Sequence, residues 1–92
     1  MFEGGRIKIE HIRYVIRMKN GTYMKQEWDG SLEKVRIDTV NNPINASLIK
    51  WKNDADRVLL EILNGSTYLL VLYDDNNPPV EVVEIKIKVE FV

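Results

Sequence analysis

The pattern of apolar residues changes from alternation to a helical repeat in the middle of the chain. Between Asn42 and Gly65, apolar residues recur at steps of three and four, which is typical of one buried helix face. Asn42 and Pro43 suit the N-cap and the first helical position, and Gly65 suits the left-handed residue after a helix. The pattern predicts one amphipathic helix over about 43–64. Its buried stripe would be Ile44, Leu48, Trp51, Ala55, Val58, Leu59 and Ile62.

A second interpretation of this segment stays open, because Asn53 and Asp54 can also begin a helix. The helix would then start near Ala55, and residues 46–52 would form a strand. Taken further, this interpretation gives the alternative fold, an all-β sandwich with strands at 46–52 and 58–63.

The first predicted strand, residues 6–18, has apolar positions that change parity partway along. Ile7 and Ile9 belong to one side of the strand, whereas the later apolar residues belong to the other. Because side chains alternate strictly along a strand, an inserted residue is needed to keep all of them on one side. The pattern therefore predicts a β-bulge near His11. The later set is Ile12, Tyr14, Ile16 and Met18.

Two turn signals connect this strand to the next two. Asn20-Gly21 predicts a hairpin, because glycine accepts the positive φ that the turn requires. A bulge-type turn places Ile16 opposite Met24, whereas a two-residue turn places it opposite a lysine; the first keeps the apolar side chains together. Asp29-Gly30 predicts the second hairpin, so we expect an antiparallel β-meander before the helix.

Two further strands are predicted after the helix, at residues 66–73 and 80–92. A polar, proline-rich loop separates them, and the second strand alternates apolar and charged residues along most of its length. The predicted fold class is therefore α+β: an antiparallel meander, one amphipathic helix, and a β-hairpin that completes a five-stranded sheet.

The strand at 67–73 is apolar on both sides. A strand of this kind is normally covered on both faces, but one helix covers only one face of a sheet. The opposite patch would then be covered by the rolled-over N-terminal hairpin, by a second copy of the chain or by another protein. The residues of this predicted partner-binding patch are Leu69, Val71 and Tyr73.

Length and composition narrow the class of protein. The chain has 92 residues, of which 45% are hydrophobic and 29% charged, and this suits one globular domain over 1–92 with a flexible lead at 1–5. It has no cysteine, which excludes disulfides, thiol catalysis and cysteine-ligated zinc. Because the sequence shows neither a signal peptide nor a bilayer-spanning apolar run, we expect a cytoplasmic protein.

Patterns that carry catalysis or metal binding are missing. His11 is the single histidine, and the five glycines do not form a phosphate-binding loop. Asp54 and Asp56 fit the opening turn or the exposed side of a helix, where negative charge is ordinary. Asp74 and Asp75 lack the glycine and the spaced acids of a calcium loop. We expect a non-enzymatic protein with no catalytic residues, no metal and no cofactor.

Positive charge is concentrated near the N-terminus. Residues 1–25 contain six Lys/Arg and two Asp/Glu, whereas the rest of the chain contains seven and twelve. One hypothesis is thus a nucleic-acid-binding module that uses a basic hairpin with an outward tyrosine. The isoelectric point near 5.8 argues against this hypothesis. The strand that is apolar on both sides instead favours an assembly or adaptor module that acts through protein–protein contacts, as a homodimer or other homo-oligomer. The nucleic-acid-binding residues would be Arg13, Arg17, Tyr23 and Lys25.

The source of the protein is ambiguous from composition. Ile, Val, Lys and Glu are abundant, as in thermophilic proteins, but the eight asparagines argue against that origin. Asn-x-Ser/Thr triplets begin at Asn20, Asn45 and Asn64, and they fit turns and caps better than glycosylation in a chain without a secretion signal. A surface or viral protein would change that interpretation.

Overall fold

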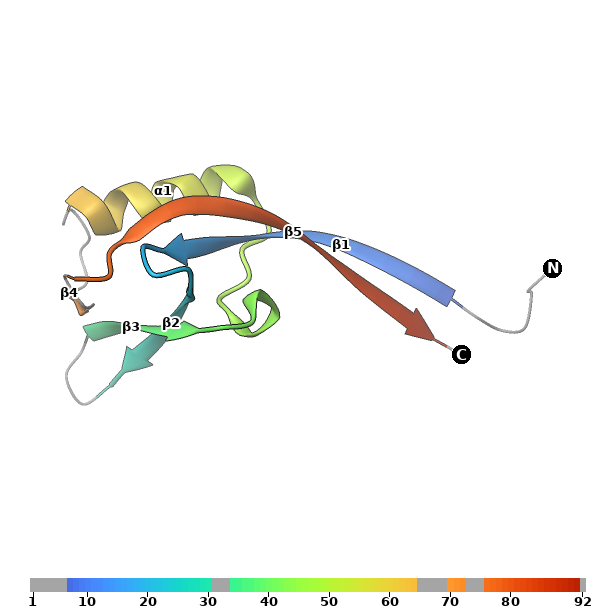
Figure 1. Ribbon diagram of the computed structural model, residues 1–92, viewed down its shortest axis with the longest axis horizontal. Helices are drawn as coiled ribbons and strands as arrows, with labels where there is room; N and C mark the ends of the chain where they lie inside the picture. Colours follow the sequence, from blue (N-terminus) through green and yellow to red (C-terminus); the bar gives the residue numbers. More distant parts are fainter. Residues whose placement is uncertain (1–6, 31–33, 65–69, 73–75, 92) are drawn as a thin grey trace.

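A computed structural model describes residues 7–30, 34–64, 70–72 and 76–91. It is an α+β fold in which one α-helix packs on an antiparallel sheet, and the all-β sandwich is not supported (Figure 1). The strands are arranged in the order β4-β3-β2-β1-β5. The elements are β1 (Ile7–Met18), β2 (Tyr23–Asp29), β3 (Lys34–Val40), the 3-10 turn η1 (Pro43–Asn45), α1 (Lys52–Asn64), β4 (Leu70–Leu72) and β5 (Pro79–Phe91).

The antiparallel sheet has four strands, β3-β2-β1-β5, and not the predicted five. The three-residue β4 pairs with β3 in parallel, with Val71 opposite Val35. The predicted hairpin between the last two strands is therefore wrong. The reason is that α1 carries the chain back along the sheet, as crossover helices do, so that the strand after it runs in the direction of β3.

The hairpin between β1 and β2 has the predicted bulge-type turn. Gly21 adopts a φ of 88°, its N–H donates to the Met18 carbonyl at 2.9 Å, and Arg17 lies opposite Tyr23. This register is the one that brings Ile16 and Met24 together, and both are buried. The predicted antiparallel pairing of the next two strands is also confirmed, with Asp29 opposite Lys34, whereas residues 31–33 of the turn lie outside the described residues.

Beyond this turn, β1 and β2 separate, and the segment between η1 and α1 joins them. Tyr14 and Ile49 exchange backbone hydrogen bonds of 2.8 and 2.9 Å across an isolated bridge. On the other side, the Ser47 N–H donates to the Met24 carbonyl at 3.0 Å, and the Gln26 N–H donates to the Ser47 hydroxyl at 2.7 Å. The segment thus satisfies backbone groups that the separated strands leave unpaired.

The prediction of one continuous helix over 43–64 is therefore wrong for the residues that precede Lys52. The expected capping chemistry is present, since the Asn42 side chain accepts from the Ile44 N–H and Pro43 follows it, but it caps only the three-residue η1. Residues 46–51 are not helical, and α1 begins at Lys52. The physical reason is tertiary: this segment gains hydrogen bonds to two strands that a helix would forgo.

The predicted bulge near His11 is also wrong. β1 pairs with β5 without interruption from Ile7 to Arg17, and the register shifts only between Arg17 and Met18. No inserted residue is needed, because β1 buries different faces at different points along its length. Val15 and Ile16 point to opposite faces and are both 0% exposed.

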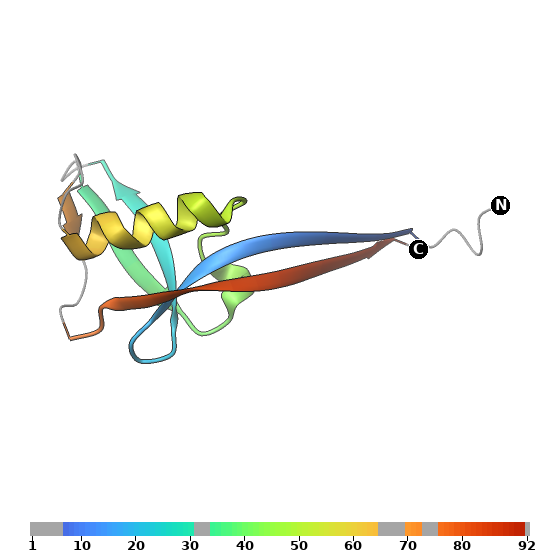
Figure 2. The same cartoon turned by 90° about the horizontal axis from the view of Figure 1, so that it is seen from above.

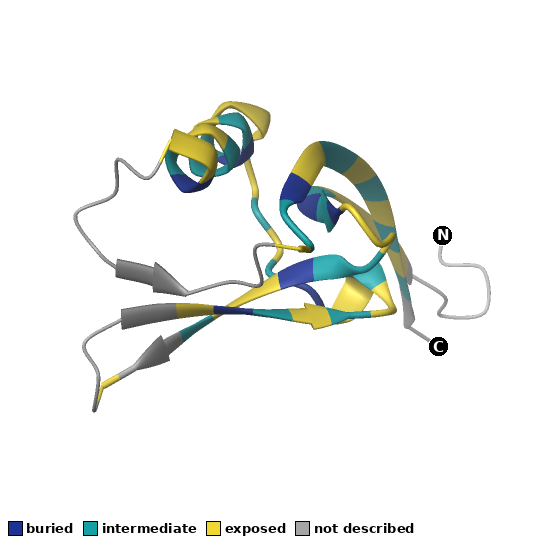
Figure 3. Ribbon diagram, turned by 60° about the vertical axis from the view of Figure 1, so that its left-hand side comes forward, coloured by how far each residue is buried: buried dark blue, intermediate teal, exposed yellow. Residues whose placement is uncertain are grey.

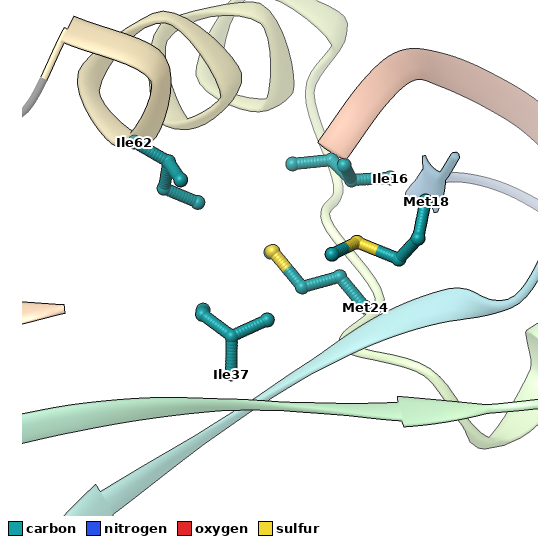
Figure 4. Close-up of a cluster of buried hydrophobic side chains, with 5 residues drawn as sticks. All are labelled: Ile16, Met18, Met24, Ile37 and Ile62. Carbon is teal, nitrogen blue, oxygen red and sulfur yellow. The ribbon is translucent and has the colours of Figure 1, made fainter. Parts of the chain in front are cut away.

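The core lies between α1 and the two separated parts of the sheet. Figure 4 shows its five buried side chains directed toward one another, with Ile62 of α1 above the others. Buried Ala55 and the partly buried Val58 and Leu59 also belong to α1. Figure 3 shows how buried, half-buried and exposed residues alternate around this helix. The core residues are Ile16, Met18, Met24, Ile37 and Ile62. The predicted stripe residues Ile44, Leu48 and Trp51 precede α1 and are exposed.

One part of the molecule extends away from this core. The N-terminal half of β1 and the C-terminal half of β5 form a two-stranded ribbon, residues 7–13 and 85–91, that projects from the body (Figures 1 and 2). The radius of gyration is 16.0 Å, whereas a compact chain of this length has about 12 Å. The longest dimension is 53 Å.

Candidate interaction surfaces

The ribbon has an apolar face. Ile9 lies opposite Val89, His11 opposite Ile87, and Arg13 opposite Ile85. Because alternate residues of a strand share a face, these six residues lie on the same side of the ribbon. Four of the six are apolar, and Ile9 is 37% exposed.

The other face of the ribbon carries charges that neutralise one another. Glu10 lies opposite Lys88, with 3.9 Å between Oε1 and Nζ, and both side chains are well exposed. Ile12, opposite Lys86, is the apolar residue on this side, and it is 46% exposed. The ribbon is therefore amphipathic across its thickness.

No described element covers the apolar face of the ribbon. α1 packs against the inner ends of β1 and β5, around Ile16, Met18 and Val82, and the ribbon extends beyond it (Figure 2). A two-stranded ribbon without a covered face is marginally stable in water. The described body provides no packing partner for this face.

A second candidate surface is a groove where the ribbon meets the body. It has a volume of about 520 Å³ and lies between β1 and the residues that lead into α1. Trp51 is 61% exposed at this groove, and the Lys50 ammonium lies 5.1 Å from the centre of its ring. The lining residues are Ile12, Arg13, Tyr14, Lys50, Trp51, Lys52 and Asn53.

Polar contacts hold several groups of this groove in place. Lys52 Nζ lies 2.9 Å from Asp56 Oδ2, and the hydrogen bond and charge of Asp56 raise the pKa of Lys52. Arg13 Nη1 donates to the Ile12 carbonyl at 2.8 Å, and the Tyr14 hydroxyl donates to Glu84 at 3.4 Å. The groove therefore combines cations with two aromatic rings.

The residues of the predicted nucleic-acid site come from β1 and β2. Arg17 lies opposite Tyr23, but Arg13 lies opposite Ile85 and Lys25 opposite Asp38. Two of the cations have acidic partners: Arg17 Nε is 2.5 Å from Glu81, and Lys25 Nζ is 3.7 Å from Glu27. Arg13 is the member of this set that lines the groove.

The groove was not predicted from the sequence, because the spacing of apolar residues places Trp51 in a buried helix stripe. The signal that could have found it is the tripeptide Lys50-Trp51-Lys52, an aromatic residue between two cations. Such a sequence favours contact with an anionic partner when it is exposed.

Most of the predicted partner-binding patch lies outside the described residues. Leu69 and Tyr73 lie outside the described residues, and so does the side chain of Val71, although its backbone belongs to β4. The patch stays a prediction. Asp74 and Asp75 also lie outside the described residues.

Two acidic residues near the start of α1 form ion pairs with neighbouring cations. Asp54 lies 3.4 Å from Arg57, and Asp56 binds Lys52. Among the described residues, no group of three or more acidic or histidine side chains could hold a metal ion. In the same part of the chain, none of the helices has the length and hydrophobicity needed to cross a bilayer.

Comparison with known proteins gives no further guide to these surfaces. We find no matching protein family, no matching curated protein and no matching solved structure.

Proposed function

We propose that this chain is a non-enzymatic assembly module that acts through protein–protein contacts and forms a homodimer. In the dimer, the apolar face of the ribbon packs against the same face of a second copy. The observation that carries the proposal is the ribbon itself: a projecting pair of strands with an apolar face that no described element covers.

Stability is the first argument for a partner. Two strands alone bury too little apolar surface to be ordered in water, whereas two ribbons packed face to face form a small two-layer sandwich. Ile9, Ile85, Ile87 and Val89 would lie between the layers, which are about 10 Å apart in such packings. Each copy supplies the layer that the other lacks.

The chemistry of the face is the argument for a second copy as that partner. Four of the six residues of the face are apolar, the other two being His11 and Arg13, whereas the opposite face contains the ion pair between Glu10 and Lys88. An apolar patch that meets itself across a twofold axis is self-complementary, as in most small homodimers. The patch is small, so we expect a dissociation constant on the order of micromolar.

A pair of matched substitutions tests this dimer. Ile87→Glu places a carboxylate on the apolar face, and Ile12→Glu makes the same change on the charged face, opposite Lys86. The mass of each protein is measured by sedimentation at about 1 to 500 µM, a range around the expected affinity. Circular dichroism establishes that both variants remain folded.

The wild-type protein and Ile12→Glu are expected to reach twice the 10.8 kDa of one chain. Ile87→Glu should remain near 10.8 kDa, because burying an unpaired carboxylate costs several kcal/mol. A folded Ile87→Glu protein that dimerises as the wild type does would contradict the proposal. So would a monomeric wild-type protein over the whole range.

A further inference from the structure

We propose that the groove between β1 and the start of α1 binds single-stranded nucleic acid. One base stacks on the Trp51 ring, and the neighbouring phosphates lie near Arg13, Lys50 and Lys52. Arg13 belongs both to this groove and to the apolar face of the ribbon, whereas Lys50, Trp51 and Lys52 lie outside that face. The proposal does not rest on the proposed dimer.

The position of Trp51 is the first argument. Its side chain is 61% exposed, and yet its backbone is fixed at the start of α1, where its carbonyl accepts the Ala55 N–H at 3.1 Å. An exposed indole on a fixed backbone can stack on a base with little loss of conformational freedom. The core does not use this ring, because the helix face that packs inward begins at Ala55.

The charges beside the ring are the second argument. The Lys50 ammonium already lies 5.1 Å from the ring centre, close enough to reach a phosphate attached to a stacked base. Arg13 and Lys52 line the same groove, and Lys86 lies opposite Ile12 on the adjoining face of the ribbon. These four cations outnumber Asp56 and Glu84, the acidic partners of the lining residues.

The geometry favours a single strand over a duplex. Base stacking on an aromatic ring requires an unpaired base, whereas a duplex offers only its phosphates to such a surface. The groove volume of about 520 Å³ can hold a base with its sugar and phosphate. Lys52 begins α1 and Lys86 belongs to the ribbon, so cations on both elements suit a strand that continues beyond the stacked nucleotide.

Fluorescence anisotropy with a labelled oligothymidine of about 12 nucleotides tests the site, a length in the usual range for such surfaces. Trp51→Ala should weaken binding roughly 5-fold to 100-fold, because one stacking contact is lost. Trp51→Phe, which keeps an aromatic ring, should recover most of the affinity. Lys50→Gln and Lys52→Gln should each lower the slope of log affinity against log salt by about one.

Two control variants remove similar side chains elsewhere. Leu60 is a 58% exposed apolar residue of α1 that does not line the groove, and Lys25 is a cation that lies near Glu27. Leu60→Ala and Lys25→Gln should change the affinity less than about twofold, since surface groups outside a site contribute little. Circular dichroism of every variant separates loss of binding from loss of fold.

Four results would overturn the proposal. The wild-type protein could fail to bind the oligonucleotide at low salt, or a folded Trp51→Ala variant could bind it as the wild type does. A duplex of the same length could bind as tightly, which would assign the contact to phosphates alone. Thymidine monophosphate could compete as well as the oligonucleotide, which would indicate a single-nucleotide site.

Discussion

The body and the ribbon are built from the same strands but differ in what covers them. β5 belongs to both: Val82 packs against the core near α1, whereas Ile87 lies in the ribbon beyond it. α1 has 13 residues and spans about 20 Å, whereas β5, also with 13 residues, spans about 43 Å. One helix therefore covers about half of this strand, and an alternating pattern does not reveal which half.

The two regions should differ most in the free energy of unfolding that is lost when an isoleucine is replaced by alanine. Ile16→Ala empties a fully buried core position and should lower the free energy of unfolding by about 2–5 kcal/mol. Ile9→Ala in the ribbon, at a concentration where the chain is monomeric, should lower it by less than about 1 kcal/mol. Urea unfolding measures both. Equal losses would show that the ribbon is packed as tightly as the core.

Local turn chemistry was predictable from the sequence, and Gly21 is the best example. The positive φ, the bulge-type turn and the meeting of Ile16 with Met24 all follow from Asn20-Gly21 and the requirement to keep apolar residues together. The capping role of Asn42 was predictable for the same reason, since it depends on neighbouring residues alone.

Substitution of Gly21, which lies in the body, should give the next largest loss in the free energy of unfolding. A Cβ at Gly21 would meet no atom within 4 Å, so Gly21→Ala changes only the backbone preference at a φ of 88°. We expect a loss of about 1 kcal/mol in the free energy of unfolding, and a smaller loss for Gly21→Asn, because asparagine tolerates this conformation. Thermal unfolding of the two variants measures the difference. An alanine variant as stable as the wild type would contradict the positive φ of Gly21 in this turn.

The tertiary pairings were not predictable from local pattern. Residues 46–51 continue the apolar spacing of α1, but their backbone hydrogen-bonds to Tyr14 and Met24, which are distant in sequence. The parallel pairing of β4 likewise depends on the crossover that α1 makes. Trp51 was assigned to the core on spacing alone, and the groove was missed for that reason.

Substitution of Ser47 tests the hydrogen bonds by which residues 46–51 connect the separated strands β1 and β2. Its hydroxyl accepts the Gln26 N–H at 2.7 Å, so Ser47→Ala removes one link between the inserted segment and β2. The loss should be about 0.5–1 kcal/mol in the free energy of unfolding, because water can replace the hydroxyl at this exposed amide. Urea unfolding measures it, and Ser47→Thr, which keeps a hydroxyl, is the control. A loss equal to that of Ile16→Ala would indicate a larger role for the segment.

The smallest effect is expected from the charged face of the ribbon. Lys88 and Glu10 are 71% and 60% exposed and 3.9 Å apart, so Lys88→Gln should change the free energy of unfolding by less than about 0.5 kcal/mol. The solution mass should not change either. A dissociated dimer in this variant would mean that the charged face, and not the apolar face, meets the second copy.

Amide hydrogen exchange at several protein concentrations tests the central claim most directly. If a second copy covers the apolar face, amides of residues 85–89 should gain protection as the concentration rises through the micromolar range, while those of residues 55–62 in α1 should not change. Ribbon amides whose protection is the same at all concentrations would contradict the claim that a second copy covers this face.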